Sequence, residues 1–497
     1  MPLAQTLSRA PVGLEAPMVT IEVHLAPGLP RFSVVGMAET SVREARDRVR
    51  AAIVQAGFSF PQHAITVHLG PADLPKHGGR YDLAIAIGIL IASGQLPPDA
   101  AANVELYGEL SLSGEVKPVP ALLTAGLRAQ AMGCSVIVPA ANGAELAQVP
   151  TLAVFAIGSL QAVAAHLNGL TPQPRCQPTN GCSEHREPMP DLADVRGHDS
   201  ARRALEIVAA GGHHLLLVGP PGSGKSMLAR RLPSLLPPLS LDEALEAAAI
   251  ASLVGAAASS AVPFRAPHHT ASAAALVGGG RDPRPGEITR AHRGVLFLDE
   301  VAEFPRSVLD ALREPLELGR IVISRAQRQT EFPARFQFVA AMNPCPCGYC
   351  GDPDVACRCT PDQTSRYQQR LSGPLLDRID VRLTVPRLDF NTLSTTRPGE
   401  PSCVVAARVA VARQRQLDRA GTLNARLERV LEQPECQLDG DGEALLARAA
   451  SQYHLSARAI ERTLRIARTI TDLAARSTIA PAAVAEALQL RGTVGNI

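Results

Sequence analysis

The sequence predicts an α/β protein built from three blocks and a linker. Residues 1–168 mix short apolar strands with helical patterns, and residues 191–400 alternate strands and helices, which is typical of a mostly parallel sheet. Residues 401–497 have helical periodicity and contain 13 Arg and no Lys. Residues 169–190 are rich in Pro and polar side chains without periodicity, which indicates a linker.

Composition narrows the class of protein. Hydrophobic residues make up 46% of the 497 residues and charged residues 19%, which is ordinary for a folded soluble protein. The longest apolar run, residues 83–93, is shorter than the ~20 residues that cross a bilayer, and the first residues do not read as a secretory signal. We therefore expect a cytoplasmic protein without a membrane partner. The net charge of +2 confines any DNA contact to local patches.

Periodicity locates the elements of the first block. Residues 18–26 alternate apolar and polar side chains, and residues 63–69 do so again, so both predict strands. A helix is expected from Thr40, its N-cap, because apolar residues then recur at helical spacing as far as Ile53. Residues 81–91 predict a buried helix.

The later blocks have equally clear elements. Apolar runs at residues 215–218, 295–298 and 336–340 predict buried strands. In the third block the clearest helix follows Ser456, whose side chain can cap it, with apolar residues at helical spacing from Ile460 onward. The residues that follow the three strands carry the chemistry.

A nucleotide-binding motif directly follows the strand predicted at residues 215–218. It fits GxxxxGK[ST], in which glycines let backbone N–H groups surround phosphates and the next helix directs its positive end at them. The lysine would neutralise the β- and γ-phosphates and the serine would bind Mg²⁺, so ATP and Mg²⁺ are the expected ligands. The motif comprises Gly219, Pro220, Pro221, Gly222, Ser223, Gly224, Lys225 and Ser226.

Two carboxylates end the strand predicted at residues 295–298. Asp299 would complete the Mg²⁺ site, and Glu300 would polarise the attacking water. A strand that ends in a solvated acidic turn is common by itself, but the upstream motif favours the catalytic interpretation. These residues predict an ATPase.

The order of the nucleotide-binding motif, GVLFLDE, FVAAMNP and LSGPLLDRID resembles the AAA+ ATPases, in the helix-insert group with magnesium chelatase and the MCM helicases. The resemblance implies that Asn343 is sensor 1, that Arg378 is an arginine finger for a neighbouring subunit, and that Arg458 is sensor 2 in a helical lid. A finger that acts between subunits implies a homo-oligomeric ring, which we expect to be a hexamer. A surface salt bridge for Arg378 and an ordinary helix-face cation for Arg458 are the alternatives.

Residues 263–300, from PFRAPHH to VLFLDE, closely resemble the magnesium-chelatase-like ATPases of the ComM family, also called YifB. The resemblance covers nearly the whole chain and implies a DNA helicase and branch-migration factor of natural transformation or recombination, with DNA and recombination proteins as partners. The alternatives are a protein-remodelling ATPase and a magnesium-chelatase-type motor for metal insertion. The adjacent His268 and His269 point apart on a helix or strand, which favours a structural or loop role over a metal site.

Residues 316–336 predict a β-hairpin, because RIVIS alternates and RAQRQT forms a basic turn. In the helix-insert group this hairpin enters the central channel, which implies Arg325 and Arg328 as contacts for DNA phosphates. Such contacts carry no sequence preference. A solvated loop tip is the alternative.

Five of the ten cysteines lie between positions 345 and 359. In a cytosolic chain this clustering favours a metal over disulfides, and four thiolates can form a closed tetrahedral Zn²⁺ site. The family resemblance selects Cys345, Cys347, Cys357 and Cys359 as structural zinc ligands, and a loop of reduced thiols is the alternative.

The first block resembles the Lon-protease-type domain in the segments LGPADLPKHGGRYDLAIAIGIL and LYGELSLSGEVKPVPALLTAG. Aligned with the protease, the position of the nucleophilic serine holds Arg80, and the region of the general-base lysine holds Leu123 and Ala125. Without a hydroxyl and a lysine, Ser–Lys proteolysis is not expected. We expect a protease-inactive α+β domain that serves as a scaffold or docking platform.

Overall fold

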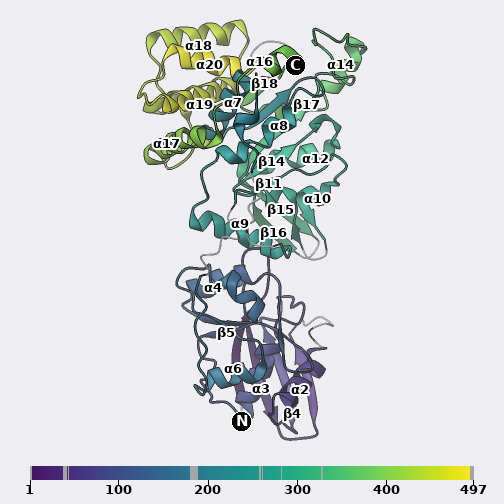
Figure 1. Cartoon of the computed structure of the whole chain (residues 1–497). Helices are drawn as coiled ribbons and strands as arrows, with labels where there is room; N and C mark the ends of the chain where they lie inside the picture. Colours follow the sequence, from purple (N-terminus) through teal and green to yellow (C-terminus); the bar gives the residue numbers. More distant parts are fainter. Residues whose placement is uncertain are drawn as a thin grey trace. The chain divides into compact units, whose positions relative to one another are not determined.

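The computed structural model describes residues 3–36, 42, 44–178, 189–256, 259, 261–280, 283–325 and 328–492 (Figure 1). The chain forms two compact units. The first unit consists of Met1–Glu184 and Leu241–Ser260, and the second of His185–Ser240 and Ala261–Ile497. The chain therefore passes from one unit to the other three times.

A mixed seven-stranded sheet, in the order β3-β4-β2-β1-β5-β8-β9, is the centre of the first unit. The β1–β2 and β2–β4 pairs are antiparallel, and the remaining pairs are parallel. The strands are β1 (Leu3–Arg9), β2 (Met18–Ala26), β3 (Arg31–Val35), β4 (Ala64–Gly70), β5 (Val104–Leu106), β8 (Ser135–Val138) and β9 (Val154–Ala156), and a short hairpin joins β6 (Glu109–Leu110) to β7 (Val116–Lys117). The strands predicted at residues 18–26 and 63–69 are confirmed as β2 and β4.

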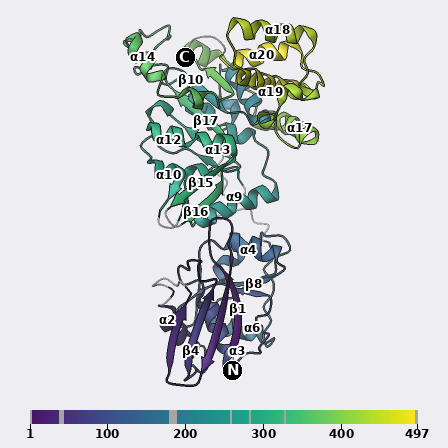
Figure 2. The same ribbon diagram turned by 180° about the vertical axis from the view of Figure 1, so that it is seen from behind.

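Helix α3 (Asp82–Ala92) is the core helix of this unit, and all of its residues are buried. Figure 1 shows α3 and α6 over one face of the sheet, and Figure 2 shows the strands from the other face. The helix expected from Thr40 is described as α2, and Thr40 itself lies outside the described residues. The other helices of the unit's first segment are α2 (Ala45–Gln55), α4 (Leu122–Ala131), α5 (Gly143–Leu146) and α6 (Leu160–Leu167).

Helix α9 (Leu241–Leu253) also belongs to the first unit, although its sequence lies within residues 191–400, the stretch expected to form the ATPase core. Its apolar side chains Leu245, Ala248 and Ala249 are buried in one hydrophobic cluster with Leu122 and other residues of α4. The burial of this apolar face explains why α9 joins the first unit.

A five-stranded parallel sheet, in the order β11-β14-β17-β10-β18, is the centre of the second unit. Its strands are β10 (Leu215–Val218), β11 (Phe264–Arg265), β14 (Val295–Leu298), β17 (Gln337–Met342) and β18 (Val381–Thr384). Two antiparallel pairs accompany it, β12 (Gly278–Gly279) with β13 (Arg284–Pro285), and β15 (Arg320–Arg325) with β16 (Arg328–Pro333). The helices around the sheet are α7 (Asp199–Gly211), α8 (Lys225–Ala229), α10 (Ala273–Val277), α11 (Glu287–Arg290), α12 (Arg306–Ala311), α13 (Arg313–Leu318), α14 (Pro361–Gln368), α15 (Gly373–Leu376) and α16 (Phe390–Thr395). The parallel sheet predicted for residues 191–400 is confirmed.

In the described residues from 401 to 492, the α-helices are α17 (Ser402–Ala420), α18 (Gly440–Gln452), α19 (Ala457–Leu473) and α20 (Pro481–Leu490). The Ser456 hydroxyl caps α19 by accepting a hydrogen bond from the Ala459 N–H. Apolar side chains of α17, α19 and α20 share one core with α7 and β10. Among the described residues, no helix combines the length and the apolar character needed to span a bilayer.

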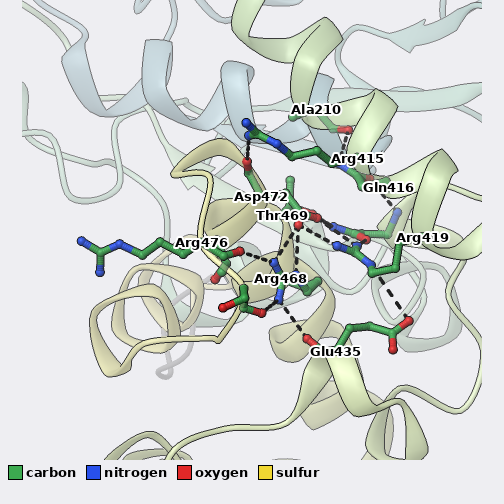
Figure 3. A network of polar contacts seen from close by, with 12 residues as sticks. Ala210, Arg415, Gln416, Arg419, Glu435, Arg468, Thr469, Asp472 and Arg476 are labelled. Carbon is green, nitrogen blue, oxygen red and sulfur yellow. Dashed lines mark hydrogen bonds and ion pairs between the residues drawn. The ribbon is translucent and has the colours of Figure 1, made fainter.

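A buried polar cluster joins α17 to α19 and to α7 (Figure 3). The Asp472 carboxylate of α19 accepts hydrogen bonds from Arg468 of the same helix and from Arg419 of α17, each at 2.7 Å. The Gln416 side chain of α17 donates to the Ala210 carbonyl of α7 at 3.1 Å. Because Asp472 is 1% exposed, its charge requires these partners.

Candidate nucleotide-binding site

The nucleotide-binding motif forms the loop between the carboxyl end of β10 and α8. Gly224 has a φ of 89°, which glycine adopts without the strain that a side chain would cause. At Gly219, a Cβ atom would lie only 2.2 Å from the Val385 carbonyl oxygen. The sequence therefore folds here into the strand–loop–helix arrangement that phosphate binding requires.

Lys225 is the first residue of α8, and its side chain reaches back to the loop. Its ammonium donates hydrogen bonds to the Gly219 and Pro220 carbonyls at 2.7 and 2.9 Å, and to Asn343 Oδ1 at 3.2 Å. Asn343 reaches it because β17, which ends at Met342, is the neighbour of β10 in the sheet. Burial lowers the pKa of Lys225, although the carboxylates of Asp299 and Glu300 oppose this change. A phosphate anion beside the ammonium would favour its charged form.

Ser226 and Asp299 meet at the ends of neighbouring elements. The Ser226 hydroxyl donates to Asp299 Oδ2 at 2.5 Å, and Asp299 directly follows β14. A hydroxyl and a carboxylate are the hard oxygen ligands that Mg²⁺ prefers. With Lys225 beside them, these residues fit a nucleoside triphosphate and its Mg²⁺ ion.

Glu300 follows Asp299 in the left-handed conformation, with a φ of 50°, and its side chain is 53% exposed. Its Oε2 atom lies 3.5 Å from Nδ1 of His269. Sequence reasoning did not predict this contact, and its only signal was the pair of adjacent histidines within residues 263–300. The structure thus places His269 beside the expected catalytic carboxylate. The ring centroids of His268 and His269 lie 4.1 Å apart, so the expectation that the two side chains point apart is wrong.

Arg378 and Arg458 line a different part of the unit. Both border a cavity of about 1010 Å³ whose lining contains none of the nucleotide-binding motif. The Arg378 guanidinium forms an ion pair with Glu317 and donates to the Pro374 carbonyl. Arg458 is exposed, and no ion pair of its side chain is found among the described residues. Within the single chain Arg378 thus forms a salt bridge, and its role as an arginine finger stays a prediction.

Arg378 lies at the opposite end of the sheet from the nucleotide-binding motif. It precedes the amino end of β18, whereas the motif follows the carboxyl end of β10. The two strands are parallel neighbours that pair Leu215 with Val381 and Val218 with Thr384. From Leu215 to Val218 the strand rises about 10 Å at ~3.3 Å per residue. Arg378 and Lys225 of one chain are therefore not brought together.

Cys345, Cys347, Cys357 and Cys359 lie with all their Sγ atoms within 4.8 Å of one another. Three of the separations are 3.4, 3.6 and 3.7 Å. Zn–S bonds of ~2.3 Å in a tetrahedron place sulfurs about 3.8 Å apart, so the four thiols fit a zinc ion. Hydrogen bonds from the backbone N–H groups of Tyr349 and Arg358 lower the pKa of Cys347 to about 6, whereas the pKa values of Cys357 and Cys359 are raised.

The cysteine loop also contacts the nucleotide-binding motif. Gly348 has a φ of 88°, and a Cβ atom on it would lie 2.6 Å from Cδ of Pro221. We expect Gly348→Ala to displace Pro221 and to raise the KM for ATP about tenfold, which corresponds to ~1.4 kcal/mol of binding energy. Steady-state ATPase assays over a range of ATP concentrations would measure this change.

The matched control is Gly351→Ala. Gly351 also has a positive φ, 77°, but no atom lies within 4 Å of the Cβ position. This variant carries the same backbone strain without touching Pro221, so its KM should stay near that of the wild type. Equal KM values for the two variants would contradict the role assigned to the Gly348–Pro221 contact.

The hairpin predicted within residues 316–336 is confirmed as β15 and β16. In the ladder between β15 and β16, the residue pair next to the turn is Arg325 with Arg328. Their side chains, and residues 326–327, lie outside what the structure describes. Arg320 at the other end of β15 is paired with Glu331 at 3.0 Å.

In the first unit, Arg80 is 4% exposed and donates to the backbone carbonyls of Arg9 and Pro120. Leu123 and Ala125 are buried in α4. The positions compared with the Lon nucleophile and base thus hold a guanidinium bound to carbonyl oxygens and two apolar side chains. This arrangement offers no hydroxyl nucleophile at the Arg80 position.

The parallel sheet, the loop after β10 and the residues ending β14 and β17 define a P-loop nucleotide-binding protein with a helical carboxyl-terminal part. Residues 191–393 match the family described as magnesium chelatase, subunit ChlI. Residues 21–142 match the subunit ChlI of Mg-chelatase, and residues 399–491 match the ChlI C-terminal family. These matches indicate an AAA+ family of ATPases.

Similar proteins identify the family more closely. YifB of Escherichia coli (strain K12) is 48% identical over 479 residues, which cover 95% of this chain and 94% of the relative. The competence protein ComM of Haemophilus influenzae is 46% identical over 503 residues, 99% of this chain and 98% of the relative. A Lon protease of Rhizobium meliloti is 28% identical over 170 residues, 32% of this chain and 21% of the protease. The chain belongs to the ComM/YifB-type family of magnesium-chelatase-like proteins.

Proposed function

We propose that this protein is an ATP-hydrolysing ring motor, most simply a hexamer, that acts on DNA as a helicase and branch-migration factor in natural transformation or recombination. In this proposal Lys225 neutralises the phosphates, and Ser226 and Asp299 hold Mg²⁺. Glu300 activates the attacking water, and Asn343 orients it. Recombination proteins are the expected partners.

The observation that carries the proposal is the position of Arg378 and Arg458 relative to the nucleotide-binding motif. Both line one cavity beyond the amino ends of β10 and β18, whereas Lys225 lies past the carboxyl end of β10. Two arginines so placed are suited to stabilise a triphosphate that another copy of the chain holds. This supports a ring in which each ATP site is shared by two protomers, with Arg378 leaving Glu317 when the neighbour docks.

DNA as the substrate is supported by the β15–β16 hairpin and by the name of the relative ComM, a competence protein. Arg325 and Arg328 at the turn would contact phosphates, and repetition around a ring would multiply these contacts. The zinc ion would be structural, held by the four cysteines. The first unit, in which Arg80 stands at the nucleophile position, would serve as a protease-inactive scaffold.

The test is the rate of ATP hydrolysis with and without forked or single-stranded DNA. DNA should raise the turnover of the wild-type protein. The double substitution Arg325→Ala and Arg328→Ala should raise the DNA concentration needed for half of this stimulation by about tenfold or more at 0.15 M salt, because phosphate contacts are lost. Arg320→Ala is the matched control, since this arginine lies on the same hairpin but away from its turn.

Metal insertion or protein remodelling is the second candidate, because the matching families are described by a magnesium chelatase subunit. Wild-type turnover that does not respond to any DNA would overturn the helicase proposal and favour this alternative. Equal loss of stimulation in Arg320→Ala would remove the specific role of the hairpin turn.

A further inference from the structure

Asp380 joins three parts of the second unit that are far apart in the sequence. It lies two residues after Arg378, immediately before β18, and is 2% exposed. Its Oδ1 atom accepts a hydrogen bond from Arg462 of α19 at 2.6 Å, and its Oδ2 atom accepts one from the His214 N–H at 3.0 Å. His214 directly precedes β10, the strand that leads to the nucleotide-binding motif.

A second contact joins the same parts. Nδ1 of His213 lies 3.6 Å from Asp380 Oδ2, and Nε2 of His213 lies 2.8 Å from the Thr469 hydroxyl of α19. His213 is fully buried. One ring nitrogen of His213 therefore lies near Asp380, in the segment of residues 378–380 that we call the Arg378 segment. The other contacts Thr469 of α19.

Several cations surround Asp380: Arg462 pairs with it directly, and the guanidinium groups of Arg465 and Arg491 also interact with its charge. Burial alone would raise the pKa of Asp380, but the contacts with His213 and Arg462 lower it well below its ordinary value. Asp380 therefore stays ionised and keeps Arg462 in place. Arg462 is one helical turn after Arg458, so the ion pair fixes the part of α19 from which Arg458 projects. Arg378, Asp380, Arg458 and Arg462 all line the cavity of about 1010 Å³.

We propose that Asp380 is a positioning residue for ATP hydrolysis, which through Arg462 holds Arg378 and Arg458 at one fixed spacing for the triphosphate of a neighbouring protomer. The inference rests on the proposed function, because it requires an ATP site shared by two copies. Two guanidinium groups can stabilise the same transition state only if both are held in register. The Arg378 segment and α19 would then move as one body.

Asp380→Asn keeps the size of the side chain and removes its charge. It should lower kcat for ATP by about tenfold or more with little change in KM, because the arginines act on the transition state rather than on binding. Arg462→Gln should produce a similar loss. The double variant with both substitutions should lose no more than either single variant, because both act through one ion pair.

Mixed rings test whether the effect crosses the interface. In Lys225→Ala the P-loop is inactive while Arg378 and Asp380 are intact, so it can supply them to the intact P-loop of another variant. An equimolar mixture of Lys225→Ala with Arg378→Ala should recover up to about a quarter of wild-type turnover, since random mixing pairs the two intact halves at one interface in four. A mixture of Lys225→Ala with Asp380→Asn should recover to a similar extent.

The outcomes separate the inference from the proposed function. If the Arg378→Ala mixture recovers but the Asp380→Asn mixture does not, Asp380 acts within its own chain through β10 and the inference is overturned. If neither mixture recovers, the shared ATP site itself fails and the inference falls with it. Recovery of both mixtures supports both.

Two further variants exclude a general effect on folding. The double variant Asp380→Asn with Arg462→Gln replaces the ion pair by two neutral side chains, so it should fold and recover in the same mixture. Asp472→Asn is the matched control, because Asp472 is equally buried on α19 but contacts Arg419 and Arg468 instead (Figure 3). Asp472→Asn should lower Tm without lowering kcat at temperatures where the protein is folded. An equal kcat loss in Asp472→Asn would overturn the inference.

Discussion

Replacement of Lys225 by Ala is expected to lower ATP turnover by about 100-fold or more. Lys225 is the only lysine of the motif, and its ammonium donates three hydrogen bonds, to Gly219, Pro220 and Asn343, that hold it in the expected phosphate site. Hydrogen bonds to charged groups contribute roughly 1.5–3 kcal/mol each, so the loss of two phosphate contacts accounts for this decrease. Phosphate release assays and the binding of a fluorescent ATP analogue would measure both effects.

The control is Lys117→Ala, another of the three lysines of the chain. Lys117 pairs with Glu115 in the first unit, and both side chains are about half exposed. Such a surface pair contributes little to stability, so turnover should remain within the error of the wild-type value. Turnover of Lys225→Ala close to that of Lys117→Ala would contradict the assigned ATP site.

Removal of one thiol from the cysteine cluster is expected to release zinc and lower Tm. Cys345 is the buried member of the four, and its Sγ lies 3.4 and 3.7 Å from those of Cys347 and Cys357. Cys345→Ala should reduce the zinc content from about one per chain to near zero and lower Tm by about 5–10 °C, because three ligands no longer close the tetrahedral site. Elemental analysis and thermal denaturation under reducing conditions would measure these changes.

Cys350→Ala provides the comparison for this substitution. Cys350 is an exposed thiol in the same segment and is not among the four clustered sulfurs. It should keep both the zinc content and Tm of the wild type. If elemental analysis finds no zinc in carefully reduced wild-type protein, the cluster is a loop of reduced thiols and the proposed zinc site is wrong.

Elements with strong local patterns were predictable from the sequence. Strands β2, β10 and β14 lie where alternation or a continuous apolar run indicates them, because burial on one or both faces determines their residues. The nucleotide-binding motif was predictable for a different reason: the spacing of its residues reflects local backbone geometry. Strand β17 extends to Met342, two residues beyond the predicted end, because pairing with Val218 of β10 sets its length.

Contacts between distant residues were not predictable in this way. Asp380 and Arg462 are 82 positions apart, and neither sequence context distinguishes a buried ion pair from two surface charges. The contact of His269 with Glu300 depends on how the segment before β14 returns to the sheet. Such arrangements follow from tertiary packing, which decides where a charged group can be desolvated. The side chains of Arg325 and Arg328 stay a prediction.

The placement of α9 has a consequence for how the molecule can be divided. A single cut within residues 169–190 would not give the first unit as an independent fragment, because α9 belongs to this unit but follows the cut in the sequence. A shortened protein that begins at the second unit would still contain α9 but not α4. The apolar side chains Leu245, Ala248 and Ala249 would then lose the α4 residues that bury them. The first unit is thus formed by two separate stretches of the chain. A fragment that contains only the second unit must therefore lack residues 241–260 as well as the first stretch.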